Sequence, residues 1–293
     1  MPKSILYNSL ILLVVSAIWG FSFVAQRAGM EFVGPYTFNG VRFALGTLSL
    51  LPLYFSQNKS KSSNQKYKKV KSIKQGILLG LVLFVGASLQ QIGMEFTTAA
   101  NGGFITSLYV ILVPFISVIF GYSINKEVWI GSVLALLGLY LLSFHGAFAL
   151  SWGDSLVLVS ALFWAVHVLL VGRYAYDADA VLLSITQFAT TAIMSLLFAL
   201  VMEEIVWEYI WQAAIPIIYG GVFSVGVAYT LQVFVQKKVA AEQAAIILSF
   251  ESAFAMLGGW ILLNEVVSMR SLAGAGLMLM GIIISQLKWE KIV

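Results

Sequence analysis

Long apolar stretches separated by short polar breaks extend through the whole chain. A helix needs about 20 mostly apolar residues to cross the hydrocarbon core of a bilayer. The pattern therefore predicts an all-α membrane protein with ten transmembrane helices and one long, lysine-rich polar loop over 56–74. The predicted spans are 5–25, 35–55, 75–94, 100–121, 128–145, 153–171, 180–201, 214–234, 243–263 and 270–287.

The two halves of the chain resemble each other in sequence. Val15-Ser16-Ala17 followed by Trp19 is matched by Val159-Ser160-Ala161 followed by Trp164. Further matches, at shifts of 142 or 143 residues, are Leu89-Gln90 with Leu231-Gln232, Asn101 with Gln243, Gly131 with Gly274, and Gly138 with Gly281. Their common order predicts two five-helix repeats, 1–146 and 147–293. Because five is odd, the second repeat enters the membrane from the opposite side, which is the inverted architecture of many secondary transporters.

Composition indicates that the solvent of this chain is lipid. Hydrophobic residues make up 60% of the sequence and charged residues 10%, whereas a soluble domain carries roughly a quarter charged residues. The absence of cysteine excludes disulfides and thiolate metal sites, and the two histidines, His145 and His167, are too few for a typical metal cluster. We therefore expect no metal and no cofactor. Basic residues concentrated in one loop are typical of a membrane surface, and we expect no nucleic-acid partner.

The distribution of basic residues predicts the orientation, because cytoplasmic loops carry an excess of lysine and arginine. With the N-terminus in the cytoplasm, fourteen of the 17 basic residues lie on the inner side. Only Arg27 and Arg270 lie outside, and Arg42 lies within the second span. We therefore expect a multi-pass protein of the cell (inner) membrane with both termini cytoplasmic. The N-terminal apolar run is predicted to be a retained helix, since it lacks a small-residue cleavage site.

Several short motifs recur at defined places in the predicted spans. They are Trp19-Gly20 and Ser22-Phe23 in the first, Arg42 in the second, Pro114 in the fourth, Phe250-Glu251 in the ninth, and Leu263-Asn264-Glu265 with Gly274 and Gly281 after it. With these motifs the chain resembles the EamA family of the drug/metabolite transporter (DMT) superfamily over nearly its whole length. The resemblance implies two inverted five-helix repeats around a central cavity that moves small metabolites, often outward. Ser252 and Tyr122 depart from the family pattern, which affects local helix geometry.

Glu251 is the most informative single position. It lies near the middle of the ninth predicted span, where an ionised carboxylate costs at least a few kcal/mol. Such a side chain should face a wet cavity or a partner, or be protonated. Steps of four residues put Gln243 on the same helix face, and the repeat pairs this face with Asn101 and Tyr109. The alternative is a neutral glutamic acid that only locks neighbouring helices together.

Two further helix faces are predicted to line a cavity and bind substrate. They consist of Trp19, Ser22 and Gln26 in the first span, and Ser160, Trp164 and His167 in the sixth. Tryptophan offers a flat apolar surface with one donor, and serine and glutamine add directional hydrogen bonds. A third, symmetric polar set consists of Gln90 and Gln91 with Tyr229 and Gln232. Ordinary packing and hydrogen bonds between helices are the alternatives for these residues. For His167, the other option is to share a proton with Glu251.

The remaining charged residues of the spans and outer loops are predicted to be structural. Arg42 is expected to pair with an acid near the interface, such as Glu31, rather than to contact substrate. Glu203, Glu204 and Glu208 are predicted to form a solvated outer cluster.

Pro114 removes a backbone hydrogen bond and is expected to kink the fourth span. The small residues around positions 131–138 and 273–281 favour close helix packing, either within the chain or across a homodimer.

These features favour secondary transport of a small polar or amphipathic metabolite by alternating access. Amino acids or related compounds are the first candidates, export is the favoured direction, and proton coupling through Glu251 is a candidate mechanism. A channel or a multidrug exporter is the alternative. An intramembrane enzyme is least favoured, because it would need acids, histidines or a nucleophile with its base clustered at one depth. The chain also lacks a phosphate-binding Gly-Lys-Ser/Thr loop, which argues against ATP hydrolysis.

Overall fold

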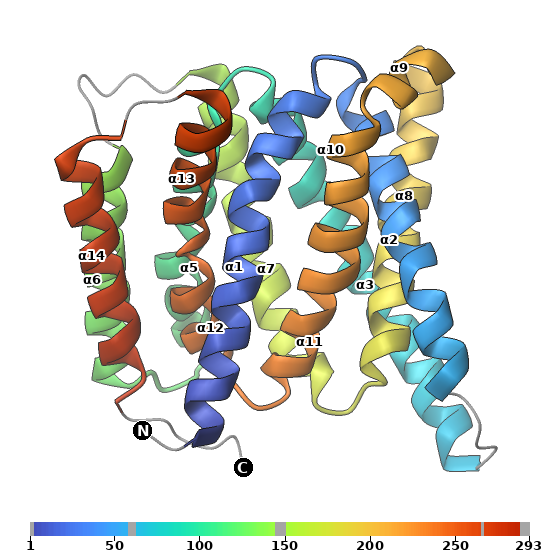
Figure 1. The fold of residues 1–293 in the computed structure, drawn as a ribbon. Helices are drawn as coiled ribbons and strands as arrows, with labels where there is room; N and C mark the ends of the chain where they lie inside the picture. The colour runs from blue at the N-terminus through green and yellow to red at the C-terminus, as the bar shows by residue number, and fades with distance from the viewer. Residues whose placement is uncertain (1–2, 58–62, 144–150, 265–266, 288–293) are drawn as a thin grey trace.

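The computed structural model describes residues 3–57, 63–143, 151–264 and 267–287. These residues form a bundle of helices that run roughly side by side (Figure 1), and no strand occurs among them. The helix α1 (Lys3–Gly29) begins and α14 (Met269–Ser285) ends at the same end of the bundle (Figure 1). The predicted repeat boundary at 146 and the residues Lys59, Lys61, His145, Glu265, Lys288 and Lys291 lie outside the described residues.

Most of the other helices are long enough to cross a large part of the bundle. They are α2 (Pro35–Gln57), α3 (Ser63–Met94), α6 (Lys126–Ser143), α7 (Trp152–Ala175) and α8 (Ala180–Met202). In three further places, consecutive short helices follow one another across the bundle; we call such a run, or a single long helix, a rod. The three runs are α4 (Ala99–Thr106) with α5 (Tyr109–Ile119), α10 (Ala214–Ile218) with η1 (Tyr219–Tyr229) and α11 (Thr230–Gln236), and α12 (Ala241–Leu248) with α13 (Glu251–Leu263). The short α9 (Trp207–Gln212) lies at the edge of the bundle (Figure 1).

Seven segments of the described chain are long and apolar enough to cross a membrane. They are Ile5–Gly29, Tyr67–Met94, Ala99–Ile119, Trp152–Ala175, Ala180–Met202, Ala214–Gln236 and Ala241–Leu262. The predicted all-α membrane fold is therefore confirmed at this level. The other three predicted spans coincide with the helices α2, α6 and α14.

The predicted loop over 56–74 is wrong in its second part. The helix α3 already begins at Ser63, so the lysines from Lys66 onward lie on a helical extension that continues into the span. Lysine and glutamine are good helix formers, and a helix that is already nucleated by its apolar part extends at little cost. The positive charge of this segment is therefore carried on a helix at the end of the bundle.

Two rods are interrupted at corresponding positions of the two halves. The break between α4 and α5 is the turn Ser107-Leu108, and the break between α12 and α13 is the turn Ser249-Phe250. The two turns touch, because Ser107 Oγ donates a hydrogen bond to the carbonyl oxygen of Ser249 over 3.0 Å. Pro114 lies inside helix α5, six residues after Leu108. The interruption at Ser107-Leu108 is therefore a separate feature, and the kink expected at Pro114 stays a prediction.

Glycines allow the closest helix contacts. A methyl group added at Gly131 would lie 2.7 Å from the carbonyl oxygen of Gly281, and one at Gly281 would lie 2.6 Å from that of Gly131. The small-residue faces of α6 and α14 are thus used against each other within one chain, at one edge of the bundle (Figure 1). In the same way Gly221 of the π-helix η1 packs against the Arg42 carbonyl of α2. A side chain at Gly221 would push these two elements apart.

Glu203 is not simply solvated, as the sequence predicted. Its two carboxylate oxygens accept hydrogen bonds from the backbone amides of Tyr36 and Thr37, each over 2.7 Å. These amides belong to the first turn of α2, whose N–H groups have no partner within the helix. The carboxylate therefore caps α2 from the end of α8 and complements the positive end of its dipole.

Candidate substrate site

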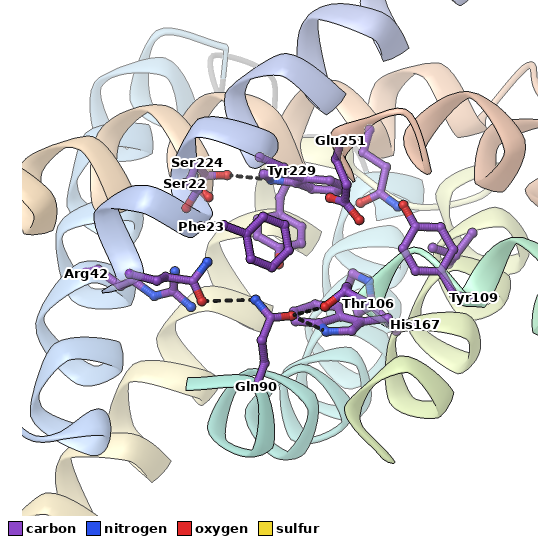
Figure 2. A pocket seen from close by; sticks show the side chains of 15 residues that line it. Ser22, Phe23, Arg42, Gln90, Thr106, Tyr109, His167, Ser224, Tyr229 and Glu251 are labelled. Carbon is purple, nitrogen blue, oxygen red and sulfur yellow. Dashed lines mark hydrogen bonds between the residues drawn. The ribbon is translucent and has the colours of Figure 1, made fainter. Parts of the chain in front are cut away.

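A central cavity of about 40 Å³ lies between the helices (Figure 2). A space of this size holds on the order of three water molecules, so in this structure the cavity is too small for most metabolites. Its walls come from α1, α2, α3, α4, α5, α7, η1, α11 and α13. The lining residues are Trp19, Ser22, Phe23, Gln26, Arg42, Gln90, Thr106, Tyr109, Trp164, His167, Val168, Ser224, Tyr229, Gln232 and Glu251.

The structure brings together most of the residues that were predicted to bind substrate. The ten that line the cavity are Trp19, Ser22, Gln26, Gln90, Tyr109, Trp164, His167, Tyr229, Gln232 and Glu251. They come from positions far apart in the chain, which share one location only because the rods pack around it. Substrate binding by these residues stays a prediction.

Four residues predicted to line the cavity lie elsewhere: Gln91, Asn101, Ser160 and Gln243. Gln91 Nε2 donates to the carbonyl oxygen of Gln26, and Ser160 Oγ donates to that of Val157. Gln243 donates through Nε2 to the carbonyl oxygen of Ser285 on α14, over 3.2 Å. Asn101 lines a separate pocket at the other end of α4. The prediction assumed one continuous helix from Gln243 to Glu251, in which side chains four residues apart share a face. The turn at Ser249-Phe250 interrupts this helix, so the spacing no longer holds between α12 and α13. Glu251 therefore faces the cavity while Gln243 faces a neighbouring helix.

Gln90 organises one wall of the cavity. Its Nε2 donates to Gln26 Oε1 over 2.9 Å, and its Oε1 accepts from Trp164 Nε1 over 2.7 Å and from Thr106 Oγ1 over 3.3 Å. Four helices are thereby connected through one amide (Figure 2). The amide nitrogen and the amide oxygen of Gln90 are both hydrogen-bonded. This holds the side chain in one position and fixes the shape of this wall of the cavity.

Aromatic rings form the opposite surface. The ring of Tyr229 lies 4.6 Å from that of Trp19 and 6.3 Å from that of Trp164, measured between centroids. The Trp19 indole also donates to the carbonyl oxygen of Ser224 over 3.2 Å. That residue lies in the π-helix η1, and π-helical turns are frequent at functional sites. Any ligand in the cavity would meet broad apolar surfaces with polar groups between them.

His167 is bound to a neighbouring helix rather than to Glu251. Its Nε2 lies 2.9 Å from Gln187 Oε1 on α8, and the two side chains are buried. Within the described chain, no hydrogen bond joins His167 to Glu251. The structure therefore supplies no direct path for a proton shared between these two residues.

Several polar atoms at the cavity make no hydrogen bond of good geometry within the described chain. They are Ser22 Oγ, Tyr109 Oη, Gln232 Oε1 and Nε2, and Glu251 Oε1. Glu251 lies within interaction range of Tyr109 and Ser107 without satisfying this oxygen. Most buried polar groups in proteins do have a partner, and each one left without costs about 1–3 kcal/mol. Such a cluster around a cavity is a set of groups arranged for a polar ligand or water.

The sequence did not identify five of the lining residues, which are Phe23, Arg42, Thr106, Val168 and Ser224. Arg42 is the charged one among them. The expected ion pair with Glu31 is wrong: Arg42 is only 3% exposed, and its Nε donates to Asn39 Oδ1 over 3.0 Å. Its guanidinium lies over the rings of Phe38 and Phe43, at 5.4 and 5.0 Å from their centroids. The available signal was its position inside a span, because ionisable residues within the membrane usually mark functional sites.

A second, more open pocket of about 450 Å³ lies toward the α4 and α7 N-termini. Arg27 lines it and donates through Nη1 to the carbonyl oxygen of Glu95 over 2.7 Å. Between this outer pocket and the central cavity lies an apolar cluster, the outer plug: Phe23, Val24, Met94, Ala99 and Ala255. Phe23 lines the cavity on one side and Ala99 lines the pocket on the other. A thin layer of apolar side chains thus separates the outer pocket from the central cavity.

A helical bundle built around a central cavity with aromatic and polar lining has the architecture expected of a membrane carrier. The sequence matches the EamA-like transporter family over residues 7–144 and again over 151–287. This chain therefore belongs to the EamA-like transporter family.

Individual relatives agree with this assignment. An uncharacterized transporter of Archaeoglobus fulgidus is 32% identical over 97% of this chain and 87% of its own length. The uncharacterized transporter YoaV of Bacillus subtilis is 26% identical over 94% of this chain and 96% of its own length. A solved crystal structure of another protein superposes with a TM-score of 0.75 over 96% of both chains, at 16% sequence identity, which indicates a shared fold.

Proposed function

We propose that this protein is a secondary transporter that moves small polar or amphipathic metabolites across the cell membrane by alternating access. The observation that carries the proposal is the small central cavity, which combines aromatic walls with several buried polar atoms that make no hydrogen bond of good geometry within the described chain. A structural membrane protein would gain stability by pairing or removing such groups. Their retention is best explained by a ligand that binds there for part of a cycle.

The paired arrangement of elements supports ten spans in two inverted repeats. If α2, α6 and α14 also cross the membrane, the rods number five in each half of the chain. The turns at Ser107 and Ser249 stand 142 residues apart, as do Tyr109 and Glu251, the first residues of the helices that follow. Helices at corresponding positions also pack against each other, α2 on α8 and α6 on α14. Two repeats of this kind can tilt against each other around a fixed midplane site.

The orientation follows from the same arrangement. The start of α1, the start of α3 and the end of α14 share one end of the bundle (Figure 1), and the lysines of α3 extend from that end. The positive-inside rule assigns this end to the cytoplasm. The outer pocket and the outer plug then lie on the external side of the cavity.

The apolar packing on the two sides of the cavity differs in extent. On the external side, the outer plug is a small cluster in which Phe23 is the aromatic member. The large core cluster includes the cavity-lining Tyr109, Trp164 and Tyr229 and also contains Leu12, Val15 and Val113, which precede the cavity along α1 and follow it along α5. A carrier needs a closure on each side that opens in turn, and the small outer plug is the natural candidate to open first toward the outside.

Amino acids or related compounds remain the first candidates for the substrate, and export remains the favoured direction. The cavity offers one carboxyl group, one guanidinium and several amides between flat aromatic surfaces. Proton coupling through Glu251 is part of the proposal, because this carboxyl group is the acid among the lining residues.

Counterflow in proteoliposomes tests this function. The purified protein is reconstituted, the vesicles are loaded with an excess of one compound from a metabolite panel, and uptake of the same labelled compound is followed. A carrier gives transient, saturable accumulation above equilibrium. A channel gives flux that does not saturate and never exceeds equilibrium. Absence of protein-dependent flux for amino acids, amines, organic acids, sugars and lipophilic cations would contradict a transport function.

A further inference from the structure

The buried guanidinium of Arg42 has no acid to neutralise it. Within the described residues, neither Nη group has a hydrogen-bond partner, and the side chain takes part in no ion pair. A buried charge without a counter-charge is strongly unfavourable unless another group compensates it. Arginine in this position is therefore arranged for an anionic group that the protein itself does not provide.

The surroundings of Arg42 hold the guanidinium in place without neutralising it. Nε is bound to Asn39 Oδ1, and Asn39 is in turn fixed because its Nδ2 donates to the carbonyl oxygen of Ala87 over 3.1 Å. The rings of Phe38 and Phe43 flank the guanidinium. A methyl group at Gly220 would lie 3.3 Å from the Arg42 Cδ, so this glycine leaves the side chain its space. With Nε occupied, the Nη groups remain available as donors.

Glu251 places a carboxyl group on the other side of the cavity, and this group carries the opposite charge when it is ionised. Figure 2 shows Arg42 on one side and Glu251 on the other, with the rings of Phe23 and Tyr229 between them. Tyr229 is within electrostatic range of the two charged groups. Arg42 and Glu251 do not form an ion pair in the described structure, although they line the same cavity. The cavity therefore has a cationic pole and an acidic pole that are held apart by aromatic surface.

We propose that Arg42 binds the carboxylate of a zwitterionic substrate whose ammonium group faces Glu251. This inference rests on the proposed transport function and specifies its substrate class. A guanidinium binds a carboxylate through paired N–H donors in a planar geometry. A zwitterion compensates both poles at once, whereas a simple amine or a simple acid leaves one of them uncompensated. A phosphate dianion fits poorly, because Arg42 is the single cationic residue among those that line the cavity.

Matched compounds test the proposal. Leucine carries both charges, leucinamide keeps the amine without the carboxylate, and 4-methylpentanoate keeps the carboxylate without the amine. Phenylalanine, phenylalaninamide and 3-phenylpropionate form a second set for the aromatic walls. Competition with counterflow in proteoliposomes gives an apparent affinity for each compound. The wild-type protein should bind the zwitterion of one set at least about tenfold more tightly than its two partners, because one charge-assisted interaction has that value.

Variants of Arg42 assign the carboxylate. Arg42→Gln should lower the affinity for the amino acid at least about tenfold and leave that for the amide nearly unchanged. Arg42→Lys keeps the charge but loses the fork of donors, so it should fold and show a smaller loss in the same direction. Glu251→Gln should instead remove discrimination against the deaminated acid. Arg173→Gln is the matched control, because Arg173 is exposed at the end of α7, away from the cavity.

The outcomes separate this inference from the function on which it rests. If the wild-type protein transports only compounds without a carboxylate, the transport function holds and the zwitterion proposal is wrong. If Arg42→Lys and a folded Arg42→Gln keep the wild-type ratio of amino acid to amide, Arg42 is a structural residue and the proposal is wrong. If no compound of the wider panel is transported, the transport function itself fails, and the proposal fails with it.

Discussion

At the scale of single residues, Glu251 links the architecture to a mechanism. It is the first residue of α13, it is 3% exposed, and it faces the cavity with an oxygen that has no hydrogen-bond partner. A carboxyl group that meets the cytoplasm in one state and the exterior in the other can carry a proton across. Glutamine has nearly the same shape and hydrogen-bonding groups but does not titrate.

Glu251→Gln is therefore expected to fold and to bind the amino acid more weakly, because the ammonium group loses its carboxylate partner. It should lose transport driven by a pH gradient, while exchange of substrate for substrate persists at higher substrate concentration. Proteoliposomes with an imposed pH gradient, compared with counterflow at equal pH, measure the two activities separately. Glu204→Gln serves as the matched control, because it removes an exposed carboxylate that does not line the cavity. Normal gradient-driven transport by Glu251→Gln across the pH range would contradict proton coupling through this residue.

Residues of the site could be predicted where the signal was local. Trp19, Ser22 and Gln26 share a face at spacings of three and four within one uninterrupted helix, so periodicity alone brought them together. Arg42 could not be assigned in this way, because its role depends on the absence of an acid among neighbours from other helices. Gln243 is separated from Glu251 by a helix break that has no clear sequence signal, and Asn101 lies at the opposite end of α4 from Thr106, in the second pocket.

At the scale of elements, the cap of α2 is a contact that the apolar pattern does not reveal. Glu203 approaches the first turn of α2 only after α8 has packed along that helix. The interruptions at Ser107 and Ser249 and the π-helix η1 are similar cases. Pro114, the proline of the span that contains Ser107, lies within α5 and does not mark the break. The two breaks meet through the hydrogen bond from Ser107 to Ser249, a contact between rods that single-sequence patterns do not contain.

Glu203→Ala should lower the stability of the folded protein by about 0.5–2 kcal/mol, the usual value of a lost helix cap. Glu203→Gln should have a smaller effect, since one amide oxygen can still accept a hydrogen bond. Thermal unfolding in detergent measures the difference. Glu204→Ala is the control, because Glu204 is exposed beside the cap. Equal melting temperatures for the Glu203→Ala and Glu204→Ala variants would show that the carboxylate does not support α2.

At the scale of the whole molecule, the class of fold was predictable and its details were not. Apolar segments of sufficient length define membrane helices almost regardless of their neighbours, and seven of them meet this criterion in the described chain. The extension of α3 to Ser63 was not visible, because a lysine-rich sequence is compatible with either a loop or a helix. The central cavity depends on how all the rods pack and follows from no single segment.

The proposed orientation is tested by labelling single cysteines, which is direct because the natural chain contains none. A cysteine introduced at Ser63 should resist a membrane-impermeant thiol reagent added to intact cells, and one at Glu204 should react. After the cells are permeabilised, the two positions should both react. The reverse pattern in intact cells would invert the topology, together with the assignment of the outer pocket and the outer plug.

The central claim, alternating access to one cavity, is tested most directly by a cysteine at Ser22, whose hydroxyl group faces the cavity without a partner. Its reaction with an impermeant thiol reagent is followed in right-side-out and in inverted vesicles, with and without Phe23→Ala, which removes the aromatic member of the outer plug. Alternating access predicts a reciprocal change: Phe23→Ala raises labelling from outside and lowers labelling from the cytoplasm. Labelling that rises from outside without any fall from the cytoplasm would indicate a channel, and a cysteine that reacts from neither side would contradict a transport cavity.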